Sequence, residues 1–192
     1  MISEEEMPRY VKKIEAEFAA LRAGIGIPAE YLPRSIVFNQ QTGIIVVSVQ
    51  SNEPLRARLF WRAAKKRKYR PIGNPPDDIW QDDVVTSNRN ADIYFKTTRF
   101  VNRGGDWVSI EQYDLLTRKS KAVLSASEFA IPDGFSKGWV SSLHGISRDD
   151  KRLLLRCGFQ KDHDSRVHYY LTWLNLKSKS IEIISHLEAV SY

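Results

Sequence analysis

Lysine and arginine gather in three short segments that could bind an anionic partner. The segments are AKKRK at residues 64–68, TRKSK at residues 117–121 and KSK at residues 177–179. Clustered cations attract phosphates and acidic protein surfaces. Lysine at a hairpin tip also discourages strand edges from pairing, so these residues have a purely structural explanation as well. The nine candidate binding residues are Lys65, Lys66, Arg67, Lys68, Arg118, Lys119, Lys121, Lys177 and Lys179.

Two other groups have residue types that catalysis or metal binding would use. Cys157 and His144 would supply a nucleophile and a base, but Cys157 follows three leucines in an alternating segment, which predicts a buried, inert thiol. His163 and His168 are metal-ligand types, but no second cluster of ligands accompanies them. The sequence has no nucleophile elbow, phosphate-binding loop or dinucleotide fingerprint. We therefore predict no catalytic residue, no metal site and no cofactor.

Length and composition describe an ordinary globular chain. Its 192 residues suit one domain or a small repeat array, with 42% hydrophobic and 27% charged residues. A net charge of +6 permits an anionic partner without requiring one. No apolar run is long enough to cross a bilayer, which predicts no membrane partner. The acidic N-terminal segment lacks the apolar stretch of a signal peptide, and a single cysteine suits a reducing compartment, so we expect a cytoplasmic protein.

Residues 3–23 have the pattern of an amphipathic helix. Ser3 is a helix cap with Glu6 three residues later, and Gly and Pro at residues 24–28 end the pattern. We expect residues 1–32 to form an N-terminal helix and linker, with the helix packing on the rest of the domain or, alternatively, binding a partner. The apolar stripe consists of Val11, Ile14, Phe18 and Leu21.

From residue 35 onward the hydrophobic pattern has a period of two. In residues 167–173, Val167, Tyr169, Leu171 and Trp173 alternate with polar or smaller residues. Val, Ile, Tyr, Phe and Trp are frequent, and turn-forming residues separate the runs. This part of the chain is predicted to form many short strands.

The strand pattern is repeated. SNRNADIYF at residues 87–95 resembles SRDDKRLLL at residues 147–155, and the offset, 147 minus 87, is 60. EQYDLLTRKSKAVL at residues 111–124 resembles LTWLNLKSKSIEII at residues 171–184, where the offset, 171 minus 111, is again 60. Because two independent segments share one offset, chance similarity is a poor explanation.

A looser copy precedes these two. Residues 39–47 precede the second turn at an offset of 48 (87 minus 39), and residues 59–72 precede the second hairpin at an offset of 52 (111 minus 59). Each unit is then a turn, two strands, a hairpin and a final strand, and the tips of equivalent hairpins should lie on one face. The three predicted units are residues 33–73, 79–125 and 137–185.

The first hairpin has a competing interpretation. Residues 52–69 begin like a helix, with Asn52 as the cap, Pro54 in the first turn and good helix formers after it. The repeat instead aligns Phe60 and Trp61 with hairpin strands of the later units. We therefore predict strands for this segment.

The turn-and-strand segments at residues 87–95 and 147–155 resemble the repeated element of TolB-type and dipeptidyl-peptidase-type β-propeller blades. Residues 170–184 are similar to the outer two strands of such a blade. In SRDDKRLLL, Arg148 stands where the family has Pro and Asp150 where it has Gly; Asp also tolerates tight turns. The resemblance implies four-stranded blades arranged around an axis. Together with the three repeats and the helix pattern, it leads us to predict a mainly β fold, a propeller-like array of three antiparallel sheets preceded by an N-terminal α-helix.

Three blades do not close a familiar ring, because propellers usually have four to eight. The first 35 residues or a second copy in a homodimer would complete the ring, or the array is open, with its edge strand covered. The family has no common chemistry, and no hydrolase domain accompanies these units. We expect a non-enzymatic protein-binding module, for example an inhibitor or a toxin-neutralising immunity protein, whose partner is a protein with acidic groups. The alternatives are a nucleic-acid-binding protein that uses the basic residues and a small hydrolase.

Overall fold

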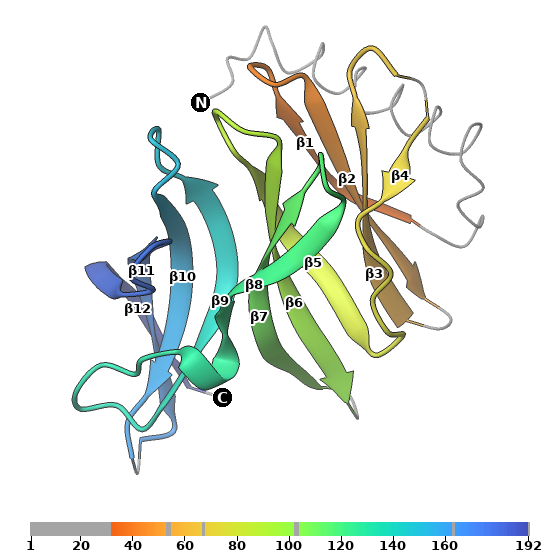
Figure 1. Cartoon of the computed structure of the whole chain (residues 1–192). Coiled ribbons are helices and arrows are strands. Elements are labelled where there is room, and N and C mark those ends of the chain that lie inside the picture. The colour runs from red at the N-terminus through yellow and green to blue at the C-terminus, as the bar shows by residue number, and fades with distance from the viewer. Residues whose placement is uncertain (1–31, 53–54, 67, 102–103, 163, 192) are drawn as a thin grey trace, which may run out of the picture.

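The computed structural model describes residues 32–52, 55–66, 68–101, 104–162 and 164–191. These residues form three antiparallel sheets of four strands each, which follow one another along the chain (Figure 1). The mainly β class and the three-sheet array are thus confirmed. The predicted helix at residues 3–23 lies outside the described residues. In the described ranges, no helix has the length and apolar character needed to cross a bilayer.

Each sheet is built from consecutive strands in order of sequence. The first contains β1 (Leu32–Asn39), β2 (Ile44–Asn52), β3 (Leu55–Ala63) and β4 (Arg70–Pro71). The second contains β5 (Ile79–Thr86), β6 (Asp92–Val101), β7 (Gly104–Asp114) and β8 (Lys119–Ser125). The third contains β9 (Lys137–Ile146), β10 (Arg152–Gln160), β11 (Arg166–Asn175) and β12 (Ile181–Ser191). A short 3₁₀ helix, η1 (Ala126–Glu128), lies between the second and third sheets in the sequence.

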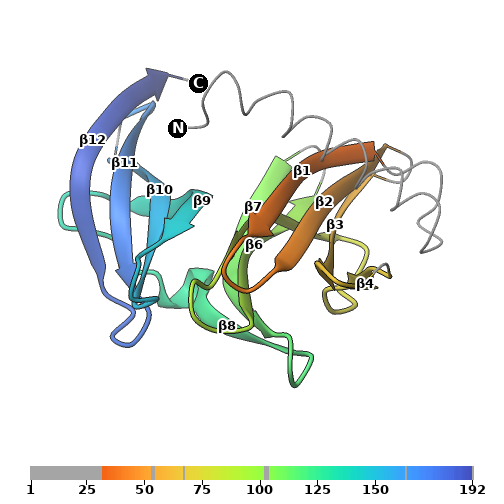
Figure 2. The same cartoon turned by 90° about the horizontal axis from the view of Figure 1, so that it is seen from above.

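The sheets fan out like blades, with the fourth strand of each at the outside (Figure 2). The turns between the first and second strands all lie at the top of the view in Figure 1. In every sheet, the turn after the third strand lies at the same end and forms a backbone hydrogen bond with the turn between the first and second strands. The amides of Ala64, Leu115 and Leu176 donate to the carbonyls of Gly43, Ala91 and Lys151, at 2.6, 2.9 and 2.9 Å. We call this end of the molecule the turn face.

Those three hydrogen bonds also identify equivalent residues in the units. The numbers of Gly43, Ala91 and Lys151 differ by 48 and then by 60, as predicted for the first turns. The numbers of Ala64, Leu115 and Leu176 differ by 51 and then by 61, so the predicted hairpin offsets, 52 and 60, were each wrong by one. The two errors cancel between the first and third units. The stretch between the paired positions simply differs in length from unit to unit.

The competition between helix and strand in the first hairpin is resolved for the described residues. Leu55–Ala63 forms β3 and pairs along its whole length with β2. Its side chains alternate between faces, with Ala57 and Leu59 fully buried and Arg58 and Phe60 partly exposed. The period of two therefore decided the structure over the helix propensity of Ala and Arg.

Two apolar cores join the sheets. Ile44, Val46 and Leu59 of the first sheet pack with Ile93 and Phe95 of the second. The other face of the second sheet contributes to a larger core with the third sheet. That core includes Tyr94, Ile110, Leu124, Leu153, Leu155, Cys157 and Phe159. The second sheet is therefore covered on both faces.

Candidate functional site

The turn face carries the basic residues singled out in the sequence. Lys65, Lys66 and Lys68 lie in or beside the β3–β4 connection and are exposed. The others lie at the tips and first residues of the last strands in the second and third sheets, and Arg67 lies outside the described residues. The exposed members in these two sheets are Arg118, Lys119, Lys121, Lys177 and Lys179.

These tips have a common local design. Asp114 Oδ1 accepts hydrogen bonds from the amides of Leu116 and Thr117, at 2.7 and 3.3 Å, and the fourth residue after it, Arg118, has a φ of 57°. Asn175 starts the β11–β12 turn in the same way, and Lys179 there has a φ of 59°. Side-chain acceptors that hold their own turns explain why these sequences form tight tips.

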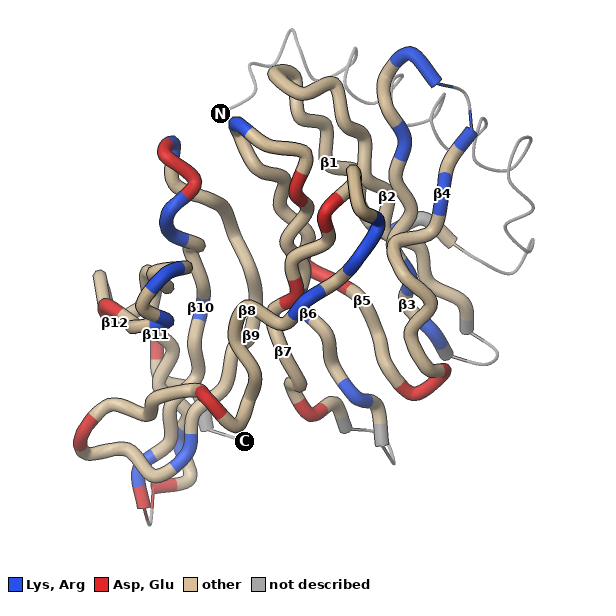
Figure 3. Tube along the Cα trace, in the orientation of Figure 1, with Lys and Arg blue, Asp and Glu red and all other residues tan. Residues whose placement is uncertain are grey.

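The charge at the turn face is mixed rather than uniformly positive. Lys179 Nζ lies 2.6 Å from Glu128 Oε1, and this hydrogen bond lowers the pKa of Glu128 to about 2. Acidic segments stand between the basic ones at this end (Figure 3), among them Asp149, which lies 3.8 Å from Lys151. A binding role for the nine basic residues stays a prediction.

Hydrogen bonds link the first turns of all three sheets. Asn39 Nδ2 donates to the Thr86 hydroxyl at 3.1 Å and to the Ser87 carbonyl at 2.5 Å. From the other side, the Asp150 carboxylate accepts from the Ser87 hydroxyl at 2.6 Å and from the Arg89 amide at 2.9 Å. Asp150 has a φ of 58°, a conformation for which Asp substitutes for Gly. The residue that departs from the blade motif thus gains a contact to the neighbouring sheet.

One face of the third sheet packs on the second sheet, and no sheet formed by the described residues covers the opposite face. Residues 153, 155 and 157 of β10 point into the core with the second sheet, so their neighbours point away from it. We call this side the open face. Its charged side chains and most of its large apolar ones lie in three rows, one on each of β10, β11 and β12, and β9 adds Trp139, whose ring lies against Gly158. The members of the three rows are Arg152, Leu154, Arg156, Tyr169, Leu171, Trp173, Glu182 and Glu188.

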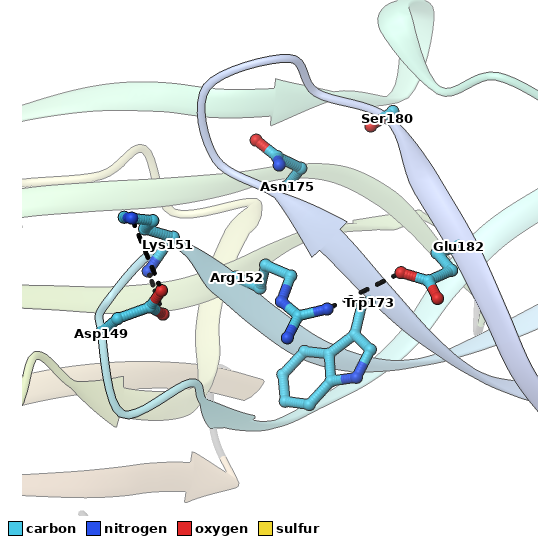
Figure 4. A pocket seen from close by; sticks show the side chains of 7 residues that line it. All are labelled: Asp149, Lys151, Arg152, Trp173, Asn175, Ser180 and Glu182. Atoms are coloured by element: carbon cyan, nitrogen blue, oxygen red, sulfur yellow. Dashed lines mark hydrogen bonds and ion pairs between the residues drawn. The ribbon is translucent and has the colours of Figure 1, made fainter.

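Arginine, aromatic and glutamate side chains are layered across the open face. The Arg152 guanidinium lies 5.0 Å from the centre of the Trp173 ring and 3.7 Å from Glu182 (Figure 4). Arg156 repeats the arrangement, since it lies 4.0 Å from the Tyr169 ring and forms an ion pair with Glu188. Guanidinium groups are attracted to aromatic faces.

A cavity of about 330 Å³ opens at the upper end of this face. It extends from the Trp173 side chain to the turns of the third sheet and contains groups of both charges (Figure 4). Its lining residues are Asp149, Lys151, Arg152, Trp173, Asn175, Ser180 and Glu182.

The outer edges of the three sheets differ strongly. The first ends in β4, which has two residues, Arg70 and Pro71, and the second ends in β8, which carries Lys119 and Lys121. The third ends in β12, which has eleven residues and contains no Lys, Arg or Pro. Short strands, charged side chains (above all lysine), proline and bulges are the usual protections against pairing with another chain. The edge strand β12 is long and has neither lysine nor proline, although it carries two glutamates and two bulges.

Two irregularities in β12 turn apolar side chains outward. The pairing with β11 skips one residue between Thr172 and Leu171, and again between Tyr170 and Tyr169. The extra residues are Ile184 and Leu187, whose side chains are 45% and 47% exposed. Bulges at sheet edges commonly redirect side chains in this way. Together with Ile183, which is 41% exposed, they form an apolar edge patch.

The two residues considered for a hydrolase site are not brought together. Cys157 is fully buried in the core, where its Sγ lies 3.2 Å from the Thr172 hydroxyl, and burial raises its pKa to about 12. His144 is exposed and its Nε2 pairs with the Ser142 hydroxyl at 2.9 Å. A neutral, enclosed thiol is a poor nucleophile.

In the histidine loop, Asp164 accepts hydrogen bonds from Arg166 and pairs with His168. His168 Nε2 lies 3.4 Å from Asp164 Oδ2, and His163 lies outside the described residues. Across the residues that are described, no three His, Cys, Asp or Glu side chains are grouped as metal ligands.

The open face and the β12 edge were missed in the sequence. Trp173 was noted only as part of an alternating strand pattern, and Arg152, Arg156, Glu182 and Glu188 were not predicted as site residues. The repeat held only a weak signal: the hydrogen bonds align Arg152 with Ile44 and Leu154 with Val46, both of which pack against the next sheet. At these positions the second unit has Asp92 and Tyr94, so a charged residue at the first position is not by itself specific to an uncovered face.

Comparisons with known proteins give a likeness of fold at low sequence identity. No family model and no curated protein sequence matches the chain. Solved structures that resemble it include an oligogalacturonate lyase in complex with manganese, at 10% identity and a TM-score of 0.47, covering 81% of this chain and 48% of that one. The GH74 xyloglucanase from Xanthomonas campestris is similar at 11% identity and a TM-score of 0.48, covering 80% and 21%.

A third such structure is the oligogalacturonate lyase from Vibrio parahaemolyticus, at 7% identity and a TM-score of 0.43, covering 81% of this chain and 48% of that one. The chain thus spans half or less of the length of the structures it resembles. At these values the likeness says nothing about activity or substrate. Relation to the TolB-type or dipeptidyl-peptidase-type propellers stays a prediction.

Proposed function

We propose that this protein is a non-enzymatic protein-binding module that captures an extended segment of its partner along β12. The observation that carries this proposal is the long outer edge of the third sheet, which lacks lysine and proline and exposes three apolar side chains. An edge strand presents unpaired backbone amides and carbonyls, and a partner strand can complete the sheet through them.

The other two edges serve as internal comparisons. The same chain protects β4 by shortness and proline and β8 by lysine, so edge protection is part of its design. The eleven residues of β12 offer a much longer template, and every described side chain from Glu182 to Ala189 is exposed. Such a difference within one repeat array favours a binding role for this edge.

The apolar edge patch supplies the specificity that backbone pairing lacks. Burying the exposed parts of Ile184 and Leu187 against a partner would contribute roughly 0.7–1.5 kcal/mol for each side chain, about half the value for a fully exposed one. Alternate side chains of the captured segment should therefore be apolar, because they would lie beside this patch. An inhibitor or a toxin-neutralising protein is one form that this function can take.

The test compares an edge variant with a matched control. Ile184→Lys combined with Leu187→Lys places charge on the edge patch, whereas Leu116→Lys changes a leucine that is 84% exposed at the β7–β8 tip. The wild type and the control should capture the same protein from a host-cell extract, and the edge variant should not.

The captured protein is then purified and titrated by calorimetry. The edge variant should bind it at least about tenfold more weakly than the wild type does, given the loss of apolar burial. Hydrogen exchange should slow at the amides of β12 in the complex and stay unchanged in β8. Equal binding by the edge variant, or failure to capture any protein, would contradict the proposed function.

A further inference from the structure

The open face of the third sheet occupies a position that serves as a sheet interface in the other two units. Ile44 and Val46 on the first sheet pack against the second sheet, and Tyr94 on the second packs against the third. At the corresponding positions the third sheet has Arg152 and Leu154. A purely apolar sheet would leave Arg152 buried without water, so the surface that fits this face must itself carry charge.

The charges of the open face are sorted by strand. Arg152 and Arg156 lie on β10, and Glu182 and Glu188 lie on β12. Between them, β11 contributes a row of apolar and aromatic side chains. A row of positive charges and a row of negative charges therefore lie on either side of an apolar row. Each arginine lies at the same level along the strands as a glutamate, because the two form an ion pair across β11.

This pattern is complementary to itself in one orientation. If a second copy lies face to face with a two-fold axis parallel to the strands, the β10 row of one copy lies over the β12 row of the other. Arg152 then faces Glu182 and Arg156 faces Glu188, while the β11 rows pack on each other. Sheets that pack face to face keep their strands nearly aligned, which fits this axis. An axis perpendicular to the strands would set arginine against arginine.

The residue types and their exposure suit such an interface. Trp, Tyr and Arg are enriched where protein surfaces bind tightly. The side chains of Glu182 and Glu188 are 72% and 51% exposed, so each keeps carboxylate surface for a second guanidinium. A two-fold interface uses the same patch on both partners, as this arrangement requires.

We propose that two copies of this protein associate through their open faces, about a two-fold axis parallel to β11. This inference goes beyond the proposed function, since it concerns the open face and not the edge patch. The dimer leaves the backbone edge of β12 in each copy available for a partner strand.

Paired charge reversal tests the proposal. Sedimentation of the wild type over a range of concentrations should show a monomer–dimer equilibrium that weakens as salt is added. Arg152→Glu with Arg156→Glu gives a negative face, and Glu182→Arg with Glu188→Arg gives a positive one. Each variant alone should dimerise at least about a hundredfold more weakly, because like charges then face each other.

Mixing the two variants in equal amounts should restore a dimer, now made of one copy of each. A second measurement does not depend on those variants. Leu171→Cys lies in the β11 row, near the axis, and should cross-link to its copy with a short bismaleimide, whereas Leu116→Cys at the β7–β8 tip should not. The buried native thiol of Cys157 should not interfere.

A wild type that stays monomeric at all concentrations would overturn the proposal. So would a mixture that fails to associate, or a Leu171→Cys variant that does not cross-link. The two surfaces remain separable: the edge variant should still dimerise, and the charge-reversed variants should still capture the β12 partner.

Discussion

The two faces of the third sheet show how one strand serves two environments. Leu153, Leu155 and Cys157 of β10 are fully buried against the second sheet. Their neighbours Arg152, Leu154 and Arg156 lie on the open face, where arginine stacks on aromatic rings and pairs with glutamate. Both groups of residues belong to the same strand and pair with the same neighbouring strands. The side chains alone decide whether a face joins the array or stays available for a partner.

Truncating a buried residue of β10 should destabilise the protein more than truncating a residue on its open face. Leu155→Ala should lower the free energy of unfolding by about 2–5 kcal/mol, because it leaves a cavity in the core between two sheets. Leu154→Ala, at the next position and on the open face, should cost about 1 kcal/mol or less. Urea denaturation of both variants measures the difference, and equal losses would show that the two faces are not distinct environments.

A smaller effect tests the link between sheets at the turn face. Asp150→Gly removes a carboxylate that accepts hydrogen bonds from Ser87 and Arg89, while glycine keeps the φ of 58° without strain. We expect a loss of about 1–3 kcal/mol in the free energy of unfolding. Asp149→Gly, which removes only contacts within its own turn, is the control. A larger loss in the control would refute the role of Asp150 between sheets.

The burial of Cys157 on the core face of β10 should also make the stability of the protein depend on pH. The pKa of Cys157 is about 12 in the folded protein and nearer 8.5 in an unfolded chain, so the unfolded state releases its proton first. Stability is then lost as pH rises above about 8.5, at a rate approaching about 1.4 kcal/mol per pH unit, and the loss levels off above the folded pKa. The Cys157→Ala variant should lack this component. Parallel stability curves for both proteins between pH 8 and pH 10 would contradict it.

A substitution at the solvent-exposed β11–β12 turn should change a pKa but have little effect on stability. Lys179→Gln removes the hydrogen bond that chiefly holds the pKa of Glu128 near 2, so the pKa should rise toward its ordinary value. Titration of the Glu128 side chain by NMR measures this shift, with Lys177→Gln as a neighbouring control. Overall stability should change little, because exposed ion pairs contribute weakly.

Much of the fold was predictable because the units repeat. Turn signals at residues 87 and 147 fixed one offset, and the alternation around Trp173 fixed the type of element. The hairpin offset was missed by one position because the connections between the second and third strands differ in length. β6 ends at Val101 and β7 begins at Gly104, whereas β10 ends at Gln160 and β11 begins at Arg166.

The candidate site was much harder to predict. Arg152 and Glu182 are far apart in the sequence and meet only because β11 lies between their strands. A local sequence pattern does not predict a contact between two strands that are separated by a third. The basic tips were visible as clusters in the sequence, but the acidic partner of Lys179, Glu128, comes from the linker before the third sheet.

The carboxylate of Asp150 has a consequence for the evolution and engineering of this array. The second unit has a turn whose hydrogen bonds are accepted by a residue of the third unit, so these units cannot be exchanged freely. Excising residues 137–191 would leave the Ser87 hydroxyl without this acceptor. The other junction is made differently, because Asn39 of the first unit donates to Thr86 and Ser87, and the second unit has Asn90 at the position of Asp150. A duplicated unit would therefore carry the contacts of its own junction and would not fit the other one.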